Sequence, residues 1–259
     1  MELKVFSTEY FNVPVSICEF VLKNKKYKEF ALYLYLKQIS NGKIKRKSLP
    51  VKSICNILQI EVRHYRNCLN YLLRNNWVGY NEKTDVLFVR KWKVIKWQIN
   101  GKSRLSARYY FNYRNSEKYF CFVAVVSSLI SSNIRESKNK RDLRSKKAER
   151  LSGRSNQLST VFDHAPFYSL QTNMITTQIL AKNLGTSLST ISLLKKGAVN
   201  LKYLEVRKNT FPVDIDPKYF NEYKCANPEI KGLFKTRDGR ILVKGCDSMF
   251  CNIVVLRRQ

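Results

Sequence analysis

The sequence predicts an α+β chain, mainly helical with small β-hairpins, made of two domains that a basic linker joins. Three observations predict this. Residues 27–92 show three helical patterns followed by two short apolar runs around a polar tip, and residues 177–196 show two short helices around a glycine. Between these patterns, residues 135–160 hold almost no large apolar side chain, which is typical of a connector. We therefore expect domains at 1–134 and 161–259.

The first helix is expected over residues 27–39, because apolar residues fall on one helical stripe, and Gly42 is a stop signal beyond it. A second helix follows Pro50, which suits a first helical turn, and ends near Leu58. Residues 59–61 make the turn into the next helix. The apolar stripe of the first helix consists of Phe30, Ala31, Leu34, Tyr35 and Ile39.

The third helix is expected over residues 62–74, where Tyr65 and Leu69 begin an apolar series at helical spacing. It should end at Asn75 and Asn76, because asparagine tolerates the left-handed conformation that closes many helices.

Two short apolar runs, at 78–80 and 86–89, flank the polar tip 81–85 and predict a β-hairpin. Across residues 27–92, the order of helices, turn and hairpin resembles the winged helix-turn-helix family, in which a hairpin wing follows the recognition helix. Gln59 stands where that family commonly has a turn glycine. The resemblance implies that the helix before the hairpin enters the major groove of DNA.

The outward face of helix 62–74 carries groups that pair with base edges, since arginine binds guanine and asparagine binds adenine bidentately. An ordinary solvated helix face is the alternative interpretation. We expect base contacts from Arg63, His64, Arg66, Asn67 and Asn70, and phosphate contacts from Arg74, Lys83, Arg90 and Lys91.

The second pattern, at residues 177–196, has a small residue, Ala181, where two helices should cross, and Gly185 where their turn needs a positive φ. It resembles the bacterial and phage helix-turn-helix repressor and regulator family. The seam between the helices should consist of Leu180, Leu184, Ile191 and Leu194. DNA contacts are expected from Ser187, Ser189, Thr190, Ser192, Lys195 and Lys196, with Ser187 or Ser189 capping the second helix. Four short strands, at 203–206, 230–234, 241–243 and 253–256, should back these helices as a wing or small sheet.

The charge balance points to a polyanionic partner. The 259 residues carry 48 lysines and arginines against 19 acidic residues, for a formal net charge of +29. Nucleic acid is the first expectation and an anionic membrane surface the second. No apolar run reaches the ~20 residues that a membrane-spanning helix needs, and the start shows no secretion signal. Whether the linker is a solvated connector or a basic arm along phosphates stays open.

Few patterns in the sequence point to catalysis or metal binding. The seven cysteines form no Cys-x-x-Cys pair and the only histidines are His64 and His164, so neither a metal nor a cofactor is expected. Asp214 and Asp216 lie in a Pro-flanked acidic turn, and no phosphate-binding loop motif occurs. The sequence therefore predicts a binding protein and not an enzyme.

These patterns predict a sequence-specific double-stranded DNA-binding protein of a plasmid, phage or other mobile element. Two helix-turn-helix units in tandem resemble the arrangement of plasmid and phage replication initiators, which implies a role in replication initiation. A transcriptional regulator and an RNA-binding protein are the alternatives. The expected location is the cytoplasm, at the bacterial nucleoid or in a phage-infected cell, with no membrane partner. The sequence leaves homodimerisation open.

Overall fold

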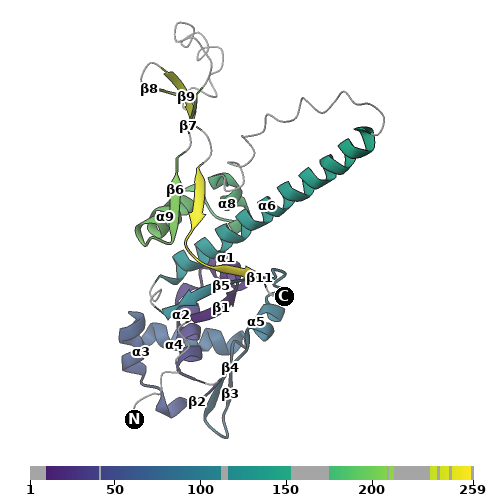
Figure 1. The fold of residues 1–259 in the computed structure, drawn as a ribbon. Coiled ribbons are helices and arrows are strands. Elements are labelled where there is room, and N and C mark those ends of the chain that lie inside the picture. Colours follow the sequence, from purple (N-terminus) through teal and green to yellow (C-terminus); the bar gives the residue numbers. More distant parts are fainter. Residues whose placement is uncertain are drawn as a thin grey trace. The chain divides into compact units, whose positions relative to one another are not determined.

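The structure is a computed structural model of the chain (Figure 1). It is an α+β structure of helices and small antiparallel sheets, as the sequence predicts. It describes residues 10–40, 42–111, 116–152, 175–208, 210–212, 234–237, 240–244 and 247–257. Contacts group these residues into two compact units: unit 1 lies within Met1–Ser128, Ala181–Tyr203 and Cys251–Gln259, and unit 2 within Leu129–Leu180 and Leu204–Phe250.

One sheet of unit 1 combines strands from opposite ends of the sequence. The central strand β5 (Leu105–Tyr110) pairs antiparallel with β1 (Tyr10–Pro14) on one edge and with β11 (Val255–Arg257) on the other. Val255 lies opposite Ala107 in this register. The expectation that the last strand backs the second pair of helices is therefore wrong, because β5 offers β11 an open edge.

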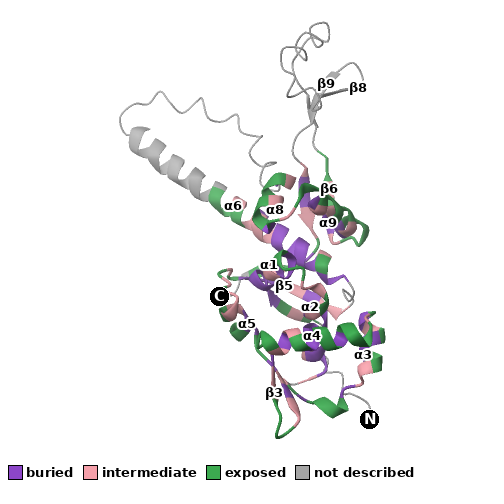
Figure 2. Cartoon of the chain, turned by 180° about the vertical axis from the view of Figure 1, so that it is seen from behind, coloured by how far each residue is buried: buried purple, intermediate pink, exposed green. Residues whose placement is uncertain are grey.

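Helix α2 (Tyr27–Gln38) follows α1 (Val15–Lys23) and lies in the core of unit 1 (Figure 2). All seven residues at positions 30–36 are buried, so the expected single stripe was too narrow. The hydroxyl of Tyr33 donates a hydrogen bond to the backbone carbonyl of Arg90 at 2.5 Å. Because its one polar group has a partner, this tyrosine fits an apolar core.

The predicted helix-turn-helix is confirmed as local structure. Helix α3 (Val51–Leu58) and helix α4 (Val62–Arg74) flank a turn in which Gln59 has a φ of 51°. The amide of Ile60 donates to the carbonyl of Cys55 at 3.0 Å, which closes α3 as a glycine would in this turn. Asn76, with a φ of 52°, closes α4 as expected.

The predicted hairpin is also present. Strands β3 (Val78–Asn81) and β4 (Val86–Val89) pair antiparallel, and β2 (Lys43–Lys45) adds a third strand on the other edge of β4. A short 3-10 helix, η1 (Arg46–Ser48), connects β2 to α3. We call the β2–β4–β3 sheet the wing. Its inner side contributes Leu87 to the core.

Helices α5 (Trp92–Gln98) and α6 (Glu117–Ser152) follow the wing. Helix α6 runs through position 134, the expected end of the first domain, and continues to Ser152 within the expected linker. Within the described ranges, no helix is at once long enough and apolar enough to cross a lipid bilayer.

The second helix-turn-helix pattern is confirmed as α8 (Thr177–Leu184) and α9 (Leu188–Asn200), with Gly185 at a φ of +60° between them. All four predicted seam residues are buried. Within unit 1, Tyr203 just beyond α9 shares a hydrogen bond of 2.7 Å with the hydroxyl of Ser116. The predicted division into 1–134 and 161–259 does not coincide with this grouping, which places α9 with the first half of the chain.

Unit 2 contains the other strands. β6 (Leu204–Arg207) pairs with β10 (Ser248–Cys251), whose last residue is grouped with unit 1. β9 (Arg240–Lys244) lies between β7 (Thr210–Pro212) and β8 (Phe234–Arg237). The predicted strands at 203–206 and 241–243 correspond to β6 and β9. Of the predicted strand 230–234, only Phe234, the first residue of β8, is described, and the predicted acidic turn at 214–216 lies outside the described ranges.

Candidate nucleic-acid interface

Helix α4 has one face in the core and one face in solvent (Figure 2). Tyr65, Cys68, Leu69 and Leu72 are buried and fix the helix against the rest of unit 1. No acidic residue occurs within the helix. All residues of the opposite face are exposed: Arg63, His64, Arg66, Asn67, Asn70 and Arg74.

The polar groups of this face are available to a ligand. Among the described residues, no ion pair involves Arg63, Arg66 or Arg74. The carboxylate of Glu61 lies 3.7 Å from Nδ1 of His64, an exposed contact that is ionic only when the histidine is protonated. Guanidinium groups without an ion pair can bind phosphates or guanine edges.

A hollow of about 520 Å³ lies beside this face, between the start of α3 and the first turns of α4. It brings the cations Arg46 and Lys52 next to Arg66 and Asn70 of α4. Arg46 and Lys52 are absent from the contacts predicted from sequence, although the basic run at 43–47 was an available signal. The hollow is completed by Val51, Val62, Tyr65 and Leu69.

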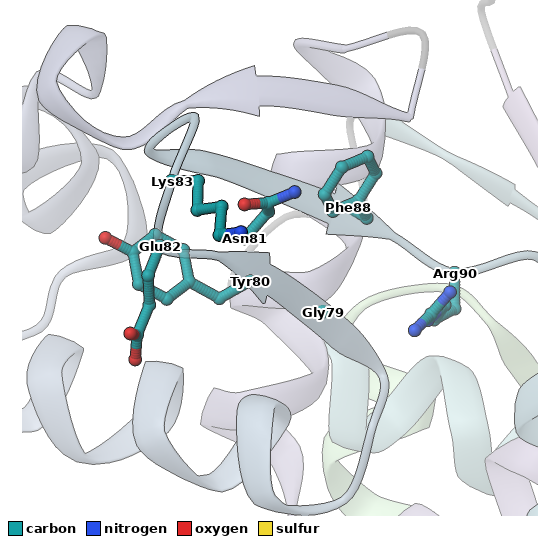
Figure 3. A pocket seen from close by; sticks show the side chains of 7 residues that line it. All are labelled: Gly79, Tyr80, Asn81, Glu82, Lys83, Phe88 and Arg90. Carbon is teal, nitrogen blue, oxygen red and sulfur yellow. The ribbon is translucent and has the colours of Figure 1, made fainter.

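The wing presents a second polar surface, around a hollow of about 630 Å³ on the hairpin (Figure 3). Asn81, Lys83 and Phe88 lie on the same side of the hairpin, whereas Glu82 points to the other side. Lys83 is exposed at the tip, so it is free to approach a phosphate. Nζ of Lys43, from β2, lies 6.0 Å from the ring centre of Phe88.

Arg90 is exposed, but its side chain is held in place by Asn76 at the end of α4 and by Gly79 of the wing. Its Nε donates to Oδ1 of Asn76 at 3.1 Å, and its guanidinium lies over Gly79, where a Cβ would approach Nη2 to 3.0 Å.

Lys91 is exposed just before α5. Burial, with repulsion from Lys91, lowers the pKa of Lys37 below its usual value.

The second group of expected contacts lies on α9 and at its N-terminal cap. Its side chains are those of serine, threonine and lysine, whereas the exposed face of α4 carries arginines and asparagines. Oγ of Ser187 accepts a hydrogen bond from the amide of Thr190 at 3.2 Å, so Ser187 is the cap of this helix, one of the two predicted choices. Its hydroxyl also bonds the hydroxyls of Ser189 and Thr190 at 2.8 and 2.9 Å, and Ser192 donates to the carbonyl of Leu188 at 2.9 Å. These hydroxyls are therefore engaged within the helix.

The start of α9 also faces another segment of unit 1. A hollow of about 310 Å³ is lined by the cap Ser187 and Thr190 at the start of α9 and by Lys23, Lys25 and other residues where α1 passes into α2. Thr190 and Lys195 are half-buried, whereas Ser189, Ser192 and Lys196 are exposed. Two of the six expected contact residues of this helix and its cap are therefore half-buried, whereas all six on α4 are exposed.

The described residues contain no group of three or more histidine, cysteine or acidic side chains positioned to hold a metal ion. Comparison with models of known protein families, with curated proteins and with solved structures gave no match.

Proposed function

We propose that this protein binds double-stranded DNA in a sequence-dependent way, with α4 in the major groove and the wing on the neighbouring backbone. The observation that carries the proposal is the outer face of α4. It exposes three arginines and two asparagines, and it has no acidic residue to neutralise them. The opposite face is fixed in the core, so the polar side chains project from a rigid helix.

The cations around α4 support the same orientation of DNA. Arg46 and Lys52 border the hollow beside Arg66, and Lys83 extends from the tip of the wing. Phosphate contacts of this kind position a protein on the duplex, whereas contacts with base edges select the sequence. Arg63, Arg66, Asn67 and Asn70 are the residues that we propose to read bases, with His64 beside them. Arg74, Arg90 and Lys91 are proposed as backbone contacts.

Binding to duplexes selected from a random pool tests this proposal. Fluorescence anisotropy would compare the wild type with the double variant Arg63→Ala/Arg66→Ala. We expect the selected site to be bound at least ~30-fold more weakly, because each arginine–guanine pair contributes ~1–3 kcal/mol. Lys118→Ala, which removes an exposed cation from α6, is the matched control and should keep wild-type affinity. Equal losses in the control and the double variant would contradict the assignment of α4.

The single variant Arg66→Ala separates base reading from charge. We expect it to relax the preference at one base position, costing ~1–3 kcal/mol there, and to change nonspecific binding much less. Equal losses on the selected site and on random DNA would show that Arg66 contacts only phosphates.

The cellular role that we propose is initiation of replication on a plasmid, phage or other mobile element. It is supported by the order of two helix-turn-helix patterns in one chain, each present as local structure. Footprinting on the DNA that flanks the gene tests it. Several repeated sites would support an initiator, and one palindrome in the gene's own promoter would instead indicate a transcriptional regulator.

A further inference from the structure

Helix α5 has a side that anchors it and a side that faces solvent. Trp92 and Ile95 are buried, and the ring of Trp92 lies 5.0 Å from the ring of Tyr33. Nζ of Lys37 lies 5.3 Å from the ring centre of Trp92. The helix is therefore fixed to the core of unit 1 by its inner side.

Trp97 projects from the outer side of this helix. It is 79% exposed, whereas the other two tryptophans, Trp77 and Trp92, are 1% and 8% exposed. Burial of a tryptophan side chain contributes a large favourable free energy. An indole that stays exposed on an ordered helix therefore suggests a binding role.

The backbone around Trp97 is held firmly. The amide of Asn100 donates to the carbonyl of Trp97 at 3.1 Å, and the amide of Gly101 donates to the carbonyl of Lys96 at 2.8 Å. This is the bonding pattern of a Schellman motif, and Asn100 has the left-handed φ of 52° that it requires. A Cβ on Gly101 would lie 2.6 Å from Oγ of Ser16, so the chain turns directly against α1.

The sequence around Trp97 carries basic residues and no acidic ones. Between Asp85 and Glu117 the chain has no acidic residue. Lys93 and Lys96 are on α5 itself, beside Trp97 in sequence. The eight basic residues of this stretch are Arg90, Lys91, Lys93, Lys96, Lys102, Arg104, Arg108 and Arg114.

We infer that Trp97 and its neighbouring lysines form a second nucleic-acid contact, one that binds single-stranded DNA by stacking an unpaired base on the indole. This inference rests on the proposed DNA binding and adds a substrate class to it. Aromatic side chains provide stacking for any base, and nearby cations bind the phosphates that link successive bases. Trp97 supplies the exposed ring and Lys93 and Lys96 supply the charge.

An anionic membrane surface would also attract an exposed tryptophan among lysines. A helix that lies in a membrane interface needs a continuous apolar face, however. Helix α5 directs Trp92 and Ile95 inward and leaves only Val94, at 37% exposure, beside Trp97. Stacking on a base needs just one ring, so the geometry favours the nucleotide.

Tryptophan fluorescence of the full-length protein, titrated with a (dT)20 oligonucleotide, tests this inference. We expect quenching in the wild type, and no comparable quenching in Trp97→Phe, which retains a ring for stacking but leaves only the two buried tryptophans. Blue-shifted emission with anionic vesicles, at concentrations where (dT)20 causes no change, would overturn the inference in favour of a membrane surface.

Anisotropy of labelled (dT)20 measures the affinity directly. Trp97→Leu should weaken binding about 5- to 140-fold, the equivalent of ~1–3 kcal/mol of stacking at 1.4 kcal/mol per tenfold. Trp97→Phe should recover most of this loss, and Val94→Ala, an exposed apolar change on the same helix, should cause none. An unchanged (dT)20 affinity for Trp97→Leu would overturn the inference.

The duplex assay separates this inference from the proposal about α4. Trp97→Leu should bind the selected duplex within about twofold of the wild type, and Arg63→Ala/Arg66→Ala should lose duplex binding. If Trp97→Leu lost duplex and (dT)20 binding equally, a separate single-strand contact would be refuted. If the arginine variant kept its duplex affinity, the proposal about α4 would fail and the (dT)20 result would stand by itself.

Discussion

The hydroxyl of Tyr80 donates a hydrogen bond of 2.9 Å to Oδ1 of Asp85, across the tip of the wing. The backbone carbonyl of Asp85 also accepts a hydrogen bond from the amide of Arg46 at 2.9 Å, and its Oδ2 accepts one from the amide of Lys47 at 3.2 Å. The guanidinium of Arg46 in turn lies 5.2 Å from the ring centre of Tyr80. One carboxylate thus joins the hairpin tip to η1, the segment that leads into α3.

Replacing Asp85 should loosen the wing. Asp85→Ala removes both side-chain hydrogen bonds and places alanine at a φ of 50°, so we expect it to lower the free energy of unfolding by ~1–3 kcal/mol in urea denaturation. Asp85→Asn keeps an acceptor and tolerates this φ, so its loss should be smaller. Equal stability of the two variants would show that the contacts are not important for the fold.

Gly197 should be required because α9 lies close to α6 within unit 1. A Cβ at this position would lie 2.1 Å from Cε1 of Tyr119. We expect Gly197→Ala to destabilise the protein by ~1–3 kcal/mol, despite the gain of ~0.5–1 kcal/mol that alanine has over glycine in a helix. In a Tyr119→Ala background the same change should be stabilising. Stabilisation by Gly197→Ala in both backgrounds would argue against the close approach.

Duplex binding should depend strongly on salt. With roughly six to ten phosphate contacts, affinity should fall by ~10³–10⁵ between about 50 and 200 mM salt. Lys83→Ala should weaken binding equally on all sequences and reduce the salt slope by about one. A flat salt response of the wild type, or an unchanged slope for Lys83→Ala, would contradict the proposed phosphate contacts.

The described thiols should be poorly reactive in the folded protein. Burial raises the pKa of Cys68 to about 11 and that of Cys251 to about 12, and it raises the pKa of Cys121 well above 9.0. Alkylation followed by mass spectrometry at pH 8 should label Cys68 about 100-fold more slowly than in urea, because thiolate is the reactive form. Equal labelling of folded and unfolded protein would contradict this burial.

The same shifts predict a loss of stability in alkali. A folded-state thiol pKa above the ordinary 9.0 means that the folded protein holds its proton after the unfolded chain has lost it. The contribution of these two thiols to the free energy of unfolding should therefore fall as the pH rises above about 9, and it should be fully lost only above about 11 to 12. Urea denaturation at pH 7, 9 and 10 measures this. The decline should be shallower in Cys68→Ala.

Much of the candidate site could be predicted from the sequence. The bounds of α4, the two wing strands, the turn at Gly185 and the capping serine all follow from patterns within a few residues of one another. Helical spacing selects which side of α4 is buried, and the exposed face then follows by exclusion. Arg46 and Lys52 could not be assigned in this way, because their proximity to Arg66 depends on how η1 and α3 pack beside α4.

The sequence by itself determined the local elements of this protein, its charge and the polar face of α4, because periodicity, turn residues and caps act over one or two turns of chain. Only the tertiary structure decided the burial of α2 on nearly every side, the pairing of β11 with β5 and the exposure of Trp97. These features depend on which strand edges and helix faces distant segments leave uncovered. An open edge of β5 accepts a strand from the other end of the chain, and no pattern within either segment specifies that partner.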